Sequence, residues 1–236
     1  MAGKTVAIVQ SCYIPWKGYF DLVAGADEFI FYDDRQFTRR DWRNRNRIKT
    51  PHGVQWLTIP VNVKGKYHQR IDETTISDPD WAERHWKTLV HSYSAAPRFR
   101  EYAPAVEELY GRVAEESHLR QVNRGFIEGV CQLLGVRTAF SWSTDYDVDG
   151  DRSGRLAALC LASRANRYLS GPRARSYLDE QVFWSQGIDV TYADYDGYPE
   201  YEQLHPPFEH GVTIFDLLFH VGSDATSYMK SFARVT

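Results

Sequence analysis

Residues 5–47 of this chain predict its fold class, because short apolar runs alternate there with polar segments. Residues 6–9 and 28–32 are apolar runs with β-branched and aromatic side chains, as in buried strands. Between them, residues 17–25 have apolar side chains at helical spacing. The order of strand, loop, helix and strand predicts an α/β protein with a mostly parallel, layered sheet, either Rossmann-like or nucleotidyltransferase-like.

The middle of the chain is predicted to be helical. Apolar residues recur at helical spacing from about residue 80, with further helices expected near 98–115 and 118–134. We therefore expect residues 1–236 to form one α/β domain, with a helical insertion or lobe at 79–134.

Strands and helices are also predicted on both sides of the insertion. The expected strands are 54–61, 136–142, 167–171 and 188–193, and the expected helices are 154–164, 173–186 and a terminal helix from Thr213. Pro60 cannot donate a backbone hydrogen bond, so strand 54–61 is expected at or near a sheet edge. Residues 62–78 are expected to form a hairpin or loop.

The composition is that of a soluble globular protein of 236 residues with a net charge of −3. The first residues lack the long apolar region of a signal peptide, and no apolar run is long enough to cross a membrane. Three widely spaced cysteines fit a reducing compartment, so we expect a cytoplasmic protein with no membrane partner. No Cys or His spacing predicts a metal site, and no motif requires a cofactor.

The loop after the first strand contains the first candidate binding residues. Gln10 and Tyr13 can hydrogen-bond a polar ligand, and Trp16 and Tyr19 can hold its sugar ring or acyl group. Gly18 permits close approach by a ligand or by backbone. Because open α/β sheets bind ligands at the carboxyl ends of their strands, we expect these five residues at a binding site. The structural alternative is a turn that the packed side chains of Pro15 and Trp16 close, with no ligand.

Residues 35–49 carry seven basic side chains against one acid, Asp41. Guanidinium groups match phosphate and carboxylate with paired hydrogen bonds, so the segment predicts a small, phosphate-bearing substrate. A solvated loop and an RNA contact are the alternatives, and the net charge of −3 gives RNA less support. The candidate binding residues here are Gln36, Arg39, Arg40, Trp42, Asn44, Arg45 and Arg47.

Three residues are candidates for catalysis. Asp33 follows the second strand directly and can serve as a general base. His91, in the first helix of the insertion, can transfer protons at neutral pH. Cys12 can carry an acyl group covalently, although a small residue packed in a loop explains it as well. His85 and Tyr93, near His91 in the sequence, are candidate binding residues.

Later segments supply supporting candidates. Ser170 and Gly171 follow a short strand and precede a helix start, where an anion can bind; a simple turn is the alternative. Tyr201 and Gln203 either close over a ligand or only bury the C-terminal part of the chain. The sequence contains no GxGxxG, P-loop or GxSxG motif, so dinucleotide-binding, P-loop and α/β-hydrolase functions lack support.

Together these positions resemble the WbqC-like family. The elements that carry the resemblance are Gln10, Tyr13, Pro15-Trp16, Gly18-Tyr19-Phe20, Asp33-Asp34, Gln36-Phe37, Arg39-Arg40, Trp42, Asn44-Arg45-Asn46-Arg47, Trp56-Leu57, Pro60, His85-Trp86, His91, Tyr93, Tyr168-Leu169-Ser170-Gly171, Tyr177-Leu178-Asp179, Tyr201, Gln203 and Asp216-Leu217-Leu218-Phe219. They occur in the family's order over nearly the whole chain. Ser11 departs from the family, which usually has proline there, and Arg35 stands where the family often has an apolar residue.

The resemblance implies a bacterial protein of surface-polysaccharide or secondary-metabolite biosynthesis. The role proposed for the family is acylation of an amino sugar, for example with glycine. We therefore expect a transferase that forms an amide between an acyl or aminoacyl donor and an amino group, such as that of a nucleotide-linked amino sugar. Aminoacyl-tRNA is a candidate donor, and Tyr177 joins the candidate binding residues.

Two other functions remain open from the sequence. The first is a nucleotide-dependent ligase or nucleotidyltransferase that uses ATP and Mg²⁺, although Lys17-Gly18-Tyr19 stands where such folds carry His-x-Gly-His. The second is a non-catalytic binding module for an anionic metabolite or an RNA acceptor end. The sequence gives neither the strand order nor the oligomeric state.

Overall fold

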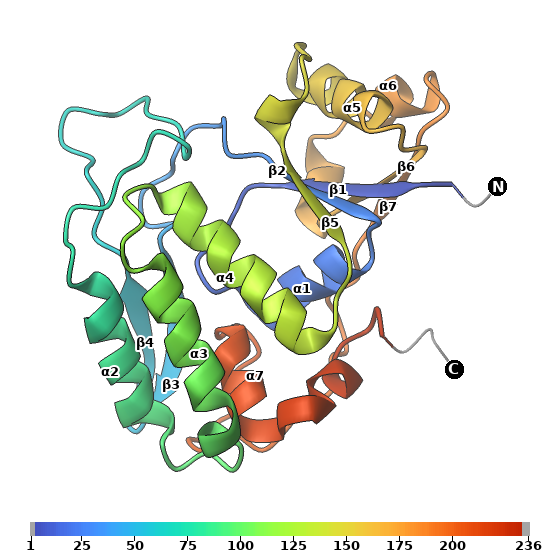
Figure 1. Ribbon diagram of the computed structural model, residues 1–236. Helices are drawn as coiled ribbons and strands as arrows, with labels where there is room; N and C mark the ends of the chain where they lie inside the picture. The colour runs from blue at the N-terminus through green and yellow to red at the C-terminus, as the bar shows by residue number, and fades with distance from the viewer. Residues whose placement is uncertain (1–2, 233–236) are drawn as a thin grey trace.

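Five parallel strands form the central sheet in the computed structural model, which describes residues 3–232 (Figure 1). They are β1 (Thr5–Val9), β2 (Glu28–Phe31), β5 (Ala139–Trp142), β6 (Arg167–Ser170) and β7 (Asp189–Tyr192), in the spatial order β5-β2-β1-β6-β7. The chain moves outward from β1 through β2 to β5 and then restarts beside β1 with β6. This is the strand order of a Rossmann-like, doubly wound sheet, and it confirms the predicted mostly parallel α/β class.

Helices cover both faces of the sheet. They are α1 (Lys17–Ala24) and α4 (Leu119–Leu134) on one face, and α5 (Arg152–Ala162) and α6 (Glu180–Trp184) on the other (Figure 1). Successive side chains of a strand point to opposite faces. Ala7 and Phe29 therefore join the core on the α1 side, whereas Val6 and Ile8 join the core on the α5 side.

Three helices of the middle segment pack together. They are α2 (Trp81–Tyr93), α3 (Phe99–Val113) and α4, and α7 (Ile214–Val221) packs against α3. Trp81, Tyr110 and Phe126 bring one buried ring each from α2, α3 and α4 into this core. Gly135 ends α4 with a left-handed φ of 71°, a conformation that glycine adopts without steric cost.

Part of the arginine-rich segment is a strand that the sequence did not predict. Strand β3 (Arg45–Thr50) pairs with β4 (Gly53–Thr58) in a separate two-stranded antiparallel sheet. Asn46 and Ile48 are buried while Arg45 and Arg47 lie outside, so β3 does alternate, but with a polar residue on its inner face. A buried asparagine among arginines hides the period of two that identifies a strand.

The helix expected over 173–186 is interrupted. A 3₁₀ helix, Pro172–Ser176, and the short α6 replace it. Tyr177 between them leaves the helical region with a φ of −143°. Asp179 then caps α6, because its carboxylate accepts a hydrogen bond from the backbone N–H of Gln181 at 3.1 Å.

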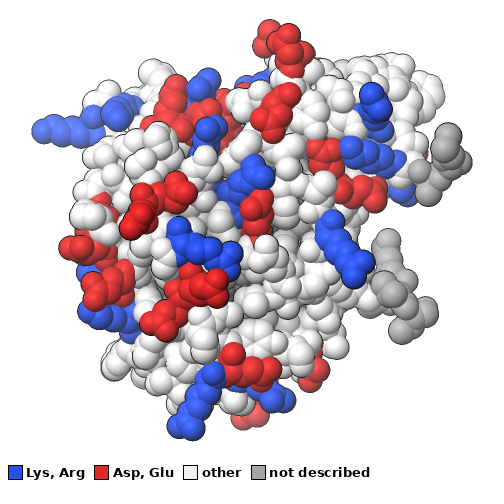
Figure 2. Space-filling model, in the orientation of Figure 1, with Lys and Arg blue, Asp and Glu red and all other residues white. Residues whose placement is uncertain are grey.

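Charged side chains of both signs are interspersed on the face that Figure 2 shows, over α2, α3 and α4. Three ion pairs of opposite charge lie there, one on each helix: Lys87–Glu83, Arg112–Glu108 and Arg124–Glu128. Within residues 3–232, no helix is both long and apolar enough to pass through a membrane.

Candidate functional site

A pocket of about 460 Å³ opens beyond the carboxyl ends of β1, β6 and β7. We call it the carboxyl-edge pocket, and it is lined by Cys12, Pro15, Trp16, Tyr19, Trp42, Asn46, Arg47, Arg173, Tyr195, His210 and Gly211. The strand order reverses between β1 and β6, and open α/β sheets bind their ligands in the crevice at such a point. The position therefore follows from the topology, and five residues that the sequence proposed (Cys12, Trp16, Tyr19, Trp42 and Arg47) meet there.

Trp16 and Gly18 form one wall together. The indole of Trp16 lies flat against the start of α1, where a Cβ at position 18 would overlap its ring atoms. Tyr195 packs edge-on against the same indole, with ring centres 5.1 Å apart. The hydroxyl of Tyr19, another lining residue, donates to the carbonyl of Gln10 at 3.2 Å. Gly18 thus serves the pocket by giving room to Trp16.

Arg43 holds the loop that follows β1. Its Nη1 donates to the carbonyl oxygens of Gln10 and Ser11, each at 3.0 Å, and lies 3.1 Å from the sulfur of Cys12. Asp41 is its nearest acid, with 3.7 Å between Nε and the carboxylate. Sequence reasoning did not select Arg43, since nothing in the sequence separates it from the six other basic residues of its segment.

The thiol of Cys12 faces the pocket but is not activated. Burial raises its pKa to about 11, and the opposing effect of Arg43 is smaller. At pH 7 a group with this pKa is ionised in only about one molecule in ten thousand, and the thiolate is the nucleophilic form.

Asp33 lies behind the loop and does not line the pocket. Its Oδ1 accepts from the backbone N–H of Ser11 at 2.7 Å, and its buried Oδ2 has no hydrogen-bond partner among the described residues. Burial raises the pKa of this carboxyl to about 6, against the lowering effects of the Ser11 hydrogen bonds and of Arg43. Asp33 therefore supports the loop that carries Cys12.

Asn46 fixes an unusual turn at the pocket's base. Ile14 has a φ of 35°, which a β-branched residue rarely adopts. The side-chain amide of Asn46 donates to the carbonyls of Tyr13 and Ile14 at 3.0 and 2.9 Å and so holds the turn in place. The buried asparagine of β3 is thus a structural requirement of the loop after β1.

Two guanidinium groups give the pocket positive charge. Arg47 donates from Nε to the carbonyl of Gly211 at 2.8 Å, and its Nη2 lies 3.3 Å from the Glu209 carboxylate. Arg173 comes from the 3₁₀ helix after β6 and is exposed. These planar groups have the geometry to bind phosphate oxygens in pairs.

His210 places an imidazole in the same pocket. Burial lowers its pKa below the usual 6.5, and the positive charge of Lys17 adds to the effect. Its Nδ1 is buried without a hydrogen-bond partner in the described part of the chain. The ring is neutral at pH 7, and a neutral imidazole has one nitrogen that can accept a proton. His210 belongs to an irregular segment with no motif, so nothing in its sequence context singles it out.

The sequence profile of the WbqC-like protein family matches residues 10–228. The chain belongs to the WbqC-like protein family. The uncharacterized protein Rv1507c of Mycobacterium tuberculosis (strain ATCC 25618 / H37Rv) is 52% identical over 229 residues, which cover 96% of this chain and 98% of that protein. No solved structure matches the chain.

Five of the proposed binding residues of this WbqC-like protein lie in buried networks away from the pocket. Tyr13 hydrogen-bonds His85 Nδ1 at 2.8 Å and the hydroxyl of Tyr110 at 2.7 Å, and burial lowers the pKa of His85 to about 4. The other three converge on the buried carboxylate of Asp216 at 2.7–2.9 Å; they are Tyr93, Tyr201 and Gln203. These networks tie the insertion to the sheet and leave their side chains no free contact with a pocket ligand.

The remaining proposed residues are dispersed around the WbqC-like fold. Those on the surface outside the pocket are Gln36, Arg39, Arg40, His91 and Tyr177. Three more are held by neighbouring groups. Asn44 donates to the Ile59 carbonyl at 2.8 Å, and Ser170 donates to the Tyr168 hydroxyl at 3.3 Å. The guanidinium of Arg45 lies over the Trp56 ring. Gly171 lies at the rim, because a Cβ there would come 3.8 Å from the Tyr195 hydroxyl.

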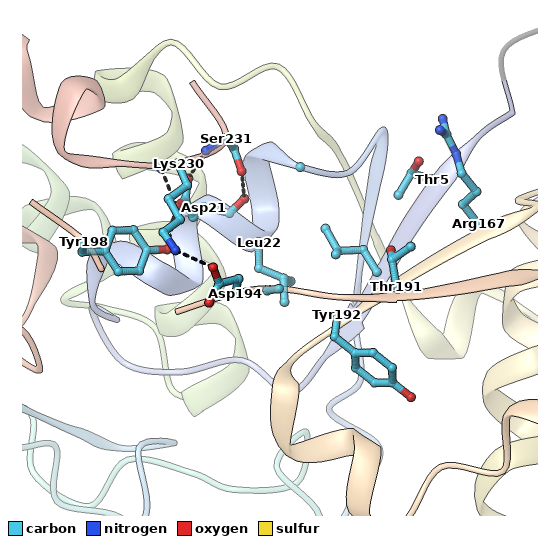
Figure 3. A pocket seen from close by; sticks show the side chains of 13 residues that line it. Thr5, Asp21, Leu22, Arg167, Thr191, Tyr192, Asp194, Tyr198, Lys230 and Ser231 are labelled. Atoms are coloured by element: carbon cyan, nitrogen blue, oxygen red, sulfur yellow. Dashed lines mark hydrogen bonds and ion pairs between the residues drawn. The ribbon is translucent and has the colours of Figure 1, made fainter. Parts of the chain in front are cut away.

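A second pocket, of about 520 Å³, lies on the α1 side of β6 and β7 (Figure 3). Asp21 is its main acidic group, and its carboxylate accepts from the Tyr198 hydroxyl at 2.6 Å and from the backbone N–H groups of Lys230 and Ser231 at 2.7 Å. The Lys230 amine in turn pairs with Asp194 at 2.8 Å. These groups fasten residues 230–231 to α1, so we assign this second pocket a structural role.

Proposed function

We propose that this WbqC-like protein transfers an acyl or aminoacyl group to the amino group of a small phosphate-bearing acceptor, such as a nucleotide-linked amino sugar, in polysaccharide or secondary-metabolite biosynthesis. The observation that supports this most is the composition of the carboxyl-edge pocket. It combines the guanidinium groups of Arg47 and Arg173, an aromatic wall and the neutral imidazole of His210 within about 460 Å³. Sites that bind small polar molecules typically have such apolar walls with a few convergent polar groups.

Each part of the pocket has a role in this reaction. Arg47 and Arg173 bind the acceptor's phosphate groups, and the rings of Trp16 and Tyr195 hold its sugar. The acceptor amine then lies within reach of His210. As its nitrogen attacks the acyl carbon, a C–N bond forms and the bond from that carbon to the donor's leaving oxygen or sulfur breaks. His210 takes the amine proton and returns it to the leaving group, so the atoms and charges balance.

The transfer is direct in this proposal. Cys12 remains a thiol at neutral pH because of its raised pKa, and Asp33 has no contact with the pocket interior. Cys12 packs against the substrate, and Asp33 supports the loop. This changes the role that the sequence suggested for both residues.

A product assay tests the proposal. The protein is incubated with a nucleoside diphosphate amino sugar and a panel of acyl and aminoacyl donors, with and without ATP and Mg²⁺, and products are analysed by mass spectrometry. An amide product that forms without ATP and is lost in His210→Gln supports the transferase. Product formation only with ATP and Mg²⁺ indicates a ligase, and saturable binding without any product indicates a binding module; either result contradicts the proposal.

A further inference from the structure

Two arginine and two tryptophan side chains, in contact one after another, lead from the surface into the carboxyl-edge pocket. The guanidinium of Arg45 lies 3.9 Å from the ring centre of Trp56, the Trp56 and Trp42 rings are 5.1 Å apart, and the Arg47 guanidinium is 5.6 Å from the Trp42 ring. We call these four residues the Arg-Trp strip. Trp42 and Arg47 also line the pocket, so the strip is continuous with the candidate site.

The register of the β3–β4 pair builds the strip. Arg47 stands directly opposite Trp56, and Arg45 lies two residues away from Arg47 on the same face of the strand. No helix covers this face, since Trp56 is 43% and Trp42 36% exposed. Large aromatic side chains left open beside guanidinium groups form a surface suited to a flat, negatively charged partner.

The charge around the strip is positive. The Arg45 guanidinium donates to the carbonyl of Arg40, and Arg39 donates to the carbonyl of Val63 at 2.6 Å, next to the exposed Lys64. The nearest acids are already engaged, because the Asp41 carboxylate lies against Arg43 and the Glu209 carboxylate against Arg47. Among the described residues Arg45 pairs with no acid, whereas Arg47 pairs with Glu209, so a polyanion still meets net positive charge along the strip, although the net charge of the whole chain is −3.

We propose that the Arg-Trp strip binds the single-stranded 3′ segment of an RNA that carries the aminoacyl donor. Aromatic rings that stack on bases, next to cations that contact the phosphates, are how proteins bind single strands. A nucleotide-linked sugar held inside the pocket leaves Trp56 and Arg45 without a role, since neither lines the pocket, whereas a longer single strand contacts the whole strip. The assignment of the donor rests on the proposed function.

The chemistry then takes place at the end of the strip. The ester bond between the aminoacyl carbonyl and the terminal ribose oxygen breaks as the acceptor amine forms the amide. The amine proton passes through His210 to the ribose oxygen, which leaves as a hydroxyl. No oxidant, reductant or further reactant is consumed.

Fluorescence anisotropy with the whole chain and a labelled single-stranded RNA of eight nucleotides tests the strip. Trp56→Ala is expected to weaken binding about 5- to 150-fold, the equivalent of one lost base stack. The matched control is Trp184→Ala, which removes a 72% exposed tryptophan on α6 and leaves binding unchanged. Arg45→Gln should reduce the slope of log K against log salt by about 0.7, and Arg112→Gln on α3 should not.

The outcomes separate this inference from the proposed function. Equal binding by the wild type and Trp56→Ala, or equal affinity for single-stranded and duplex RNA, overturns the strip as a single-strand site. If small donors still give the amide in that case, the proposed function stands without RNA. If single-stranded RNA binds through Trp56 but an aminoacylated RNA gives no amide, the donor role is overturned.

Discussion

The guanidinium of Arg43 lies 3.1 Å from the sulfur of Cys12 and binds the two preceding carbonyl groups as well. A cation beside a thiol often activates it, but here burial has the larger effect and keeps the pKa at about 11. The contact therefore fixes the shape of the loop after β1. Cys12 is thus part of the pocket's wall, and in the proposed mechanism His210 transfers the proton.

Cys12→Ser is expected to retain amide formation within a few-fold of the wild type, because direct transfer does not require a thiolate. Intact-protein mass spectrometry during turnover should show no acyl adduct on the wild-type chain. An adduct that appears on the wild type and disappears in Cys12→Ser would restore the covalent route.

Asp33 makes stability depend on pH in a definite direction. Its folded-state pKa of about 6 exceeds the ordinary 3.8 of an aspartate carboxyl, so the folded chain retains a proton that the unfolded chain releases. The protonated carboxyl of Asp33 adds roughly 3 kcal/mol to the free energy of unfolding. This stabilisation is complete below about pH 4 and is lost as the pH rises to about 6. Urea unfolding measures the difference in free energy of unfolding between the wild type and Asp33→Asn. This difference should change by roughly 3 kcal/mol between about pH 4 and 7. A difference that does not vary with pH would contradict the raised pKa.

Gly18→Ala should damage the pocket, because the added Cβ overlaps the indole of Trp16. We expect a loss of about 1–3 kcal/mol in the free energy of unfolding, together with weaker ligand binding. Gly111→Ala in α3 is the matched control, since a Cβ there meets no atom within 4 Å. That change should stabilise the protein by about 0.5–1 kcal/mol, as alanine usually does in a helix. Similar effects of the two substitutions on stability and binding would argue against the Trp16–Gly18 contact.

His210→Gln should lower kcat about 10²- to 10⁴-fold, the usual contribution of a general base. Since its pKa lies below 6.5, wild-type activity should stay level from about pH 7 to 8 and decline only at lower pH. The variant should lose this acid limb, and His52→Gln on the exposed β3–β4 turn should keep it. An unchanged pH profile in His210→Gln would assign the base to another group.

The strands of the main sheet could be predicted because apolar runs such as residues 6–8 and 29–31 are buried on both faces. Such runs can be recognised as strands without knowing which distant segments pair with them. Strand β3 could not be predicted, since Asn46 occupies a core position only because its amide meets carbonyls 32 and 33 residues away. The strand order, which sets the pocket's place, comes from long-range pairing that one sequence does not reveal.

The residues of the candidate site also fall into those that the sequence could predict and those that it could not. Trp16 and Arg47 could be proposed because they lie in a loop after β1 and in a basic segment. His210 and Tyr195 come from an irregular segment that only the folded chain brings to this edge. Tyr93 looked like a binding residue, but its hydroxyl meets Asp216, 123 residues away, and the sequence shows no sign of that bond.

Isothermal titration of a nucleoside diphosphate amino sugar into Arg173→Gln and Arg175→Gln tests the phosphate-binding pocket most directly. Both arginines belong to the same 3₁₀ helix, but Arg173 lines the pocket and the Arg175 guanidinium lies 4.8 Å from the ring centre of Tyr192. We predict that Arg173→Gln weakens binding about 10- to 150-fold, the loss of a charged hydrogen bond, and that Arg175→Gln binds like the wild type. Wild-type affinity in Arg173→Gln, or equal losses in both variants, would contradict the assignment of the carboxyl-edge pocket as the substrate site.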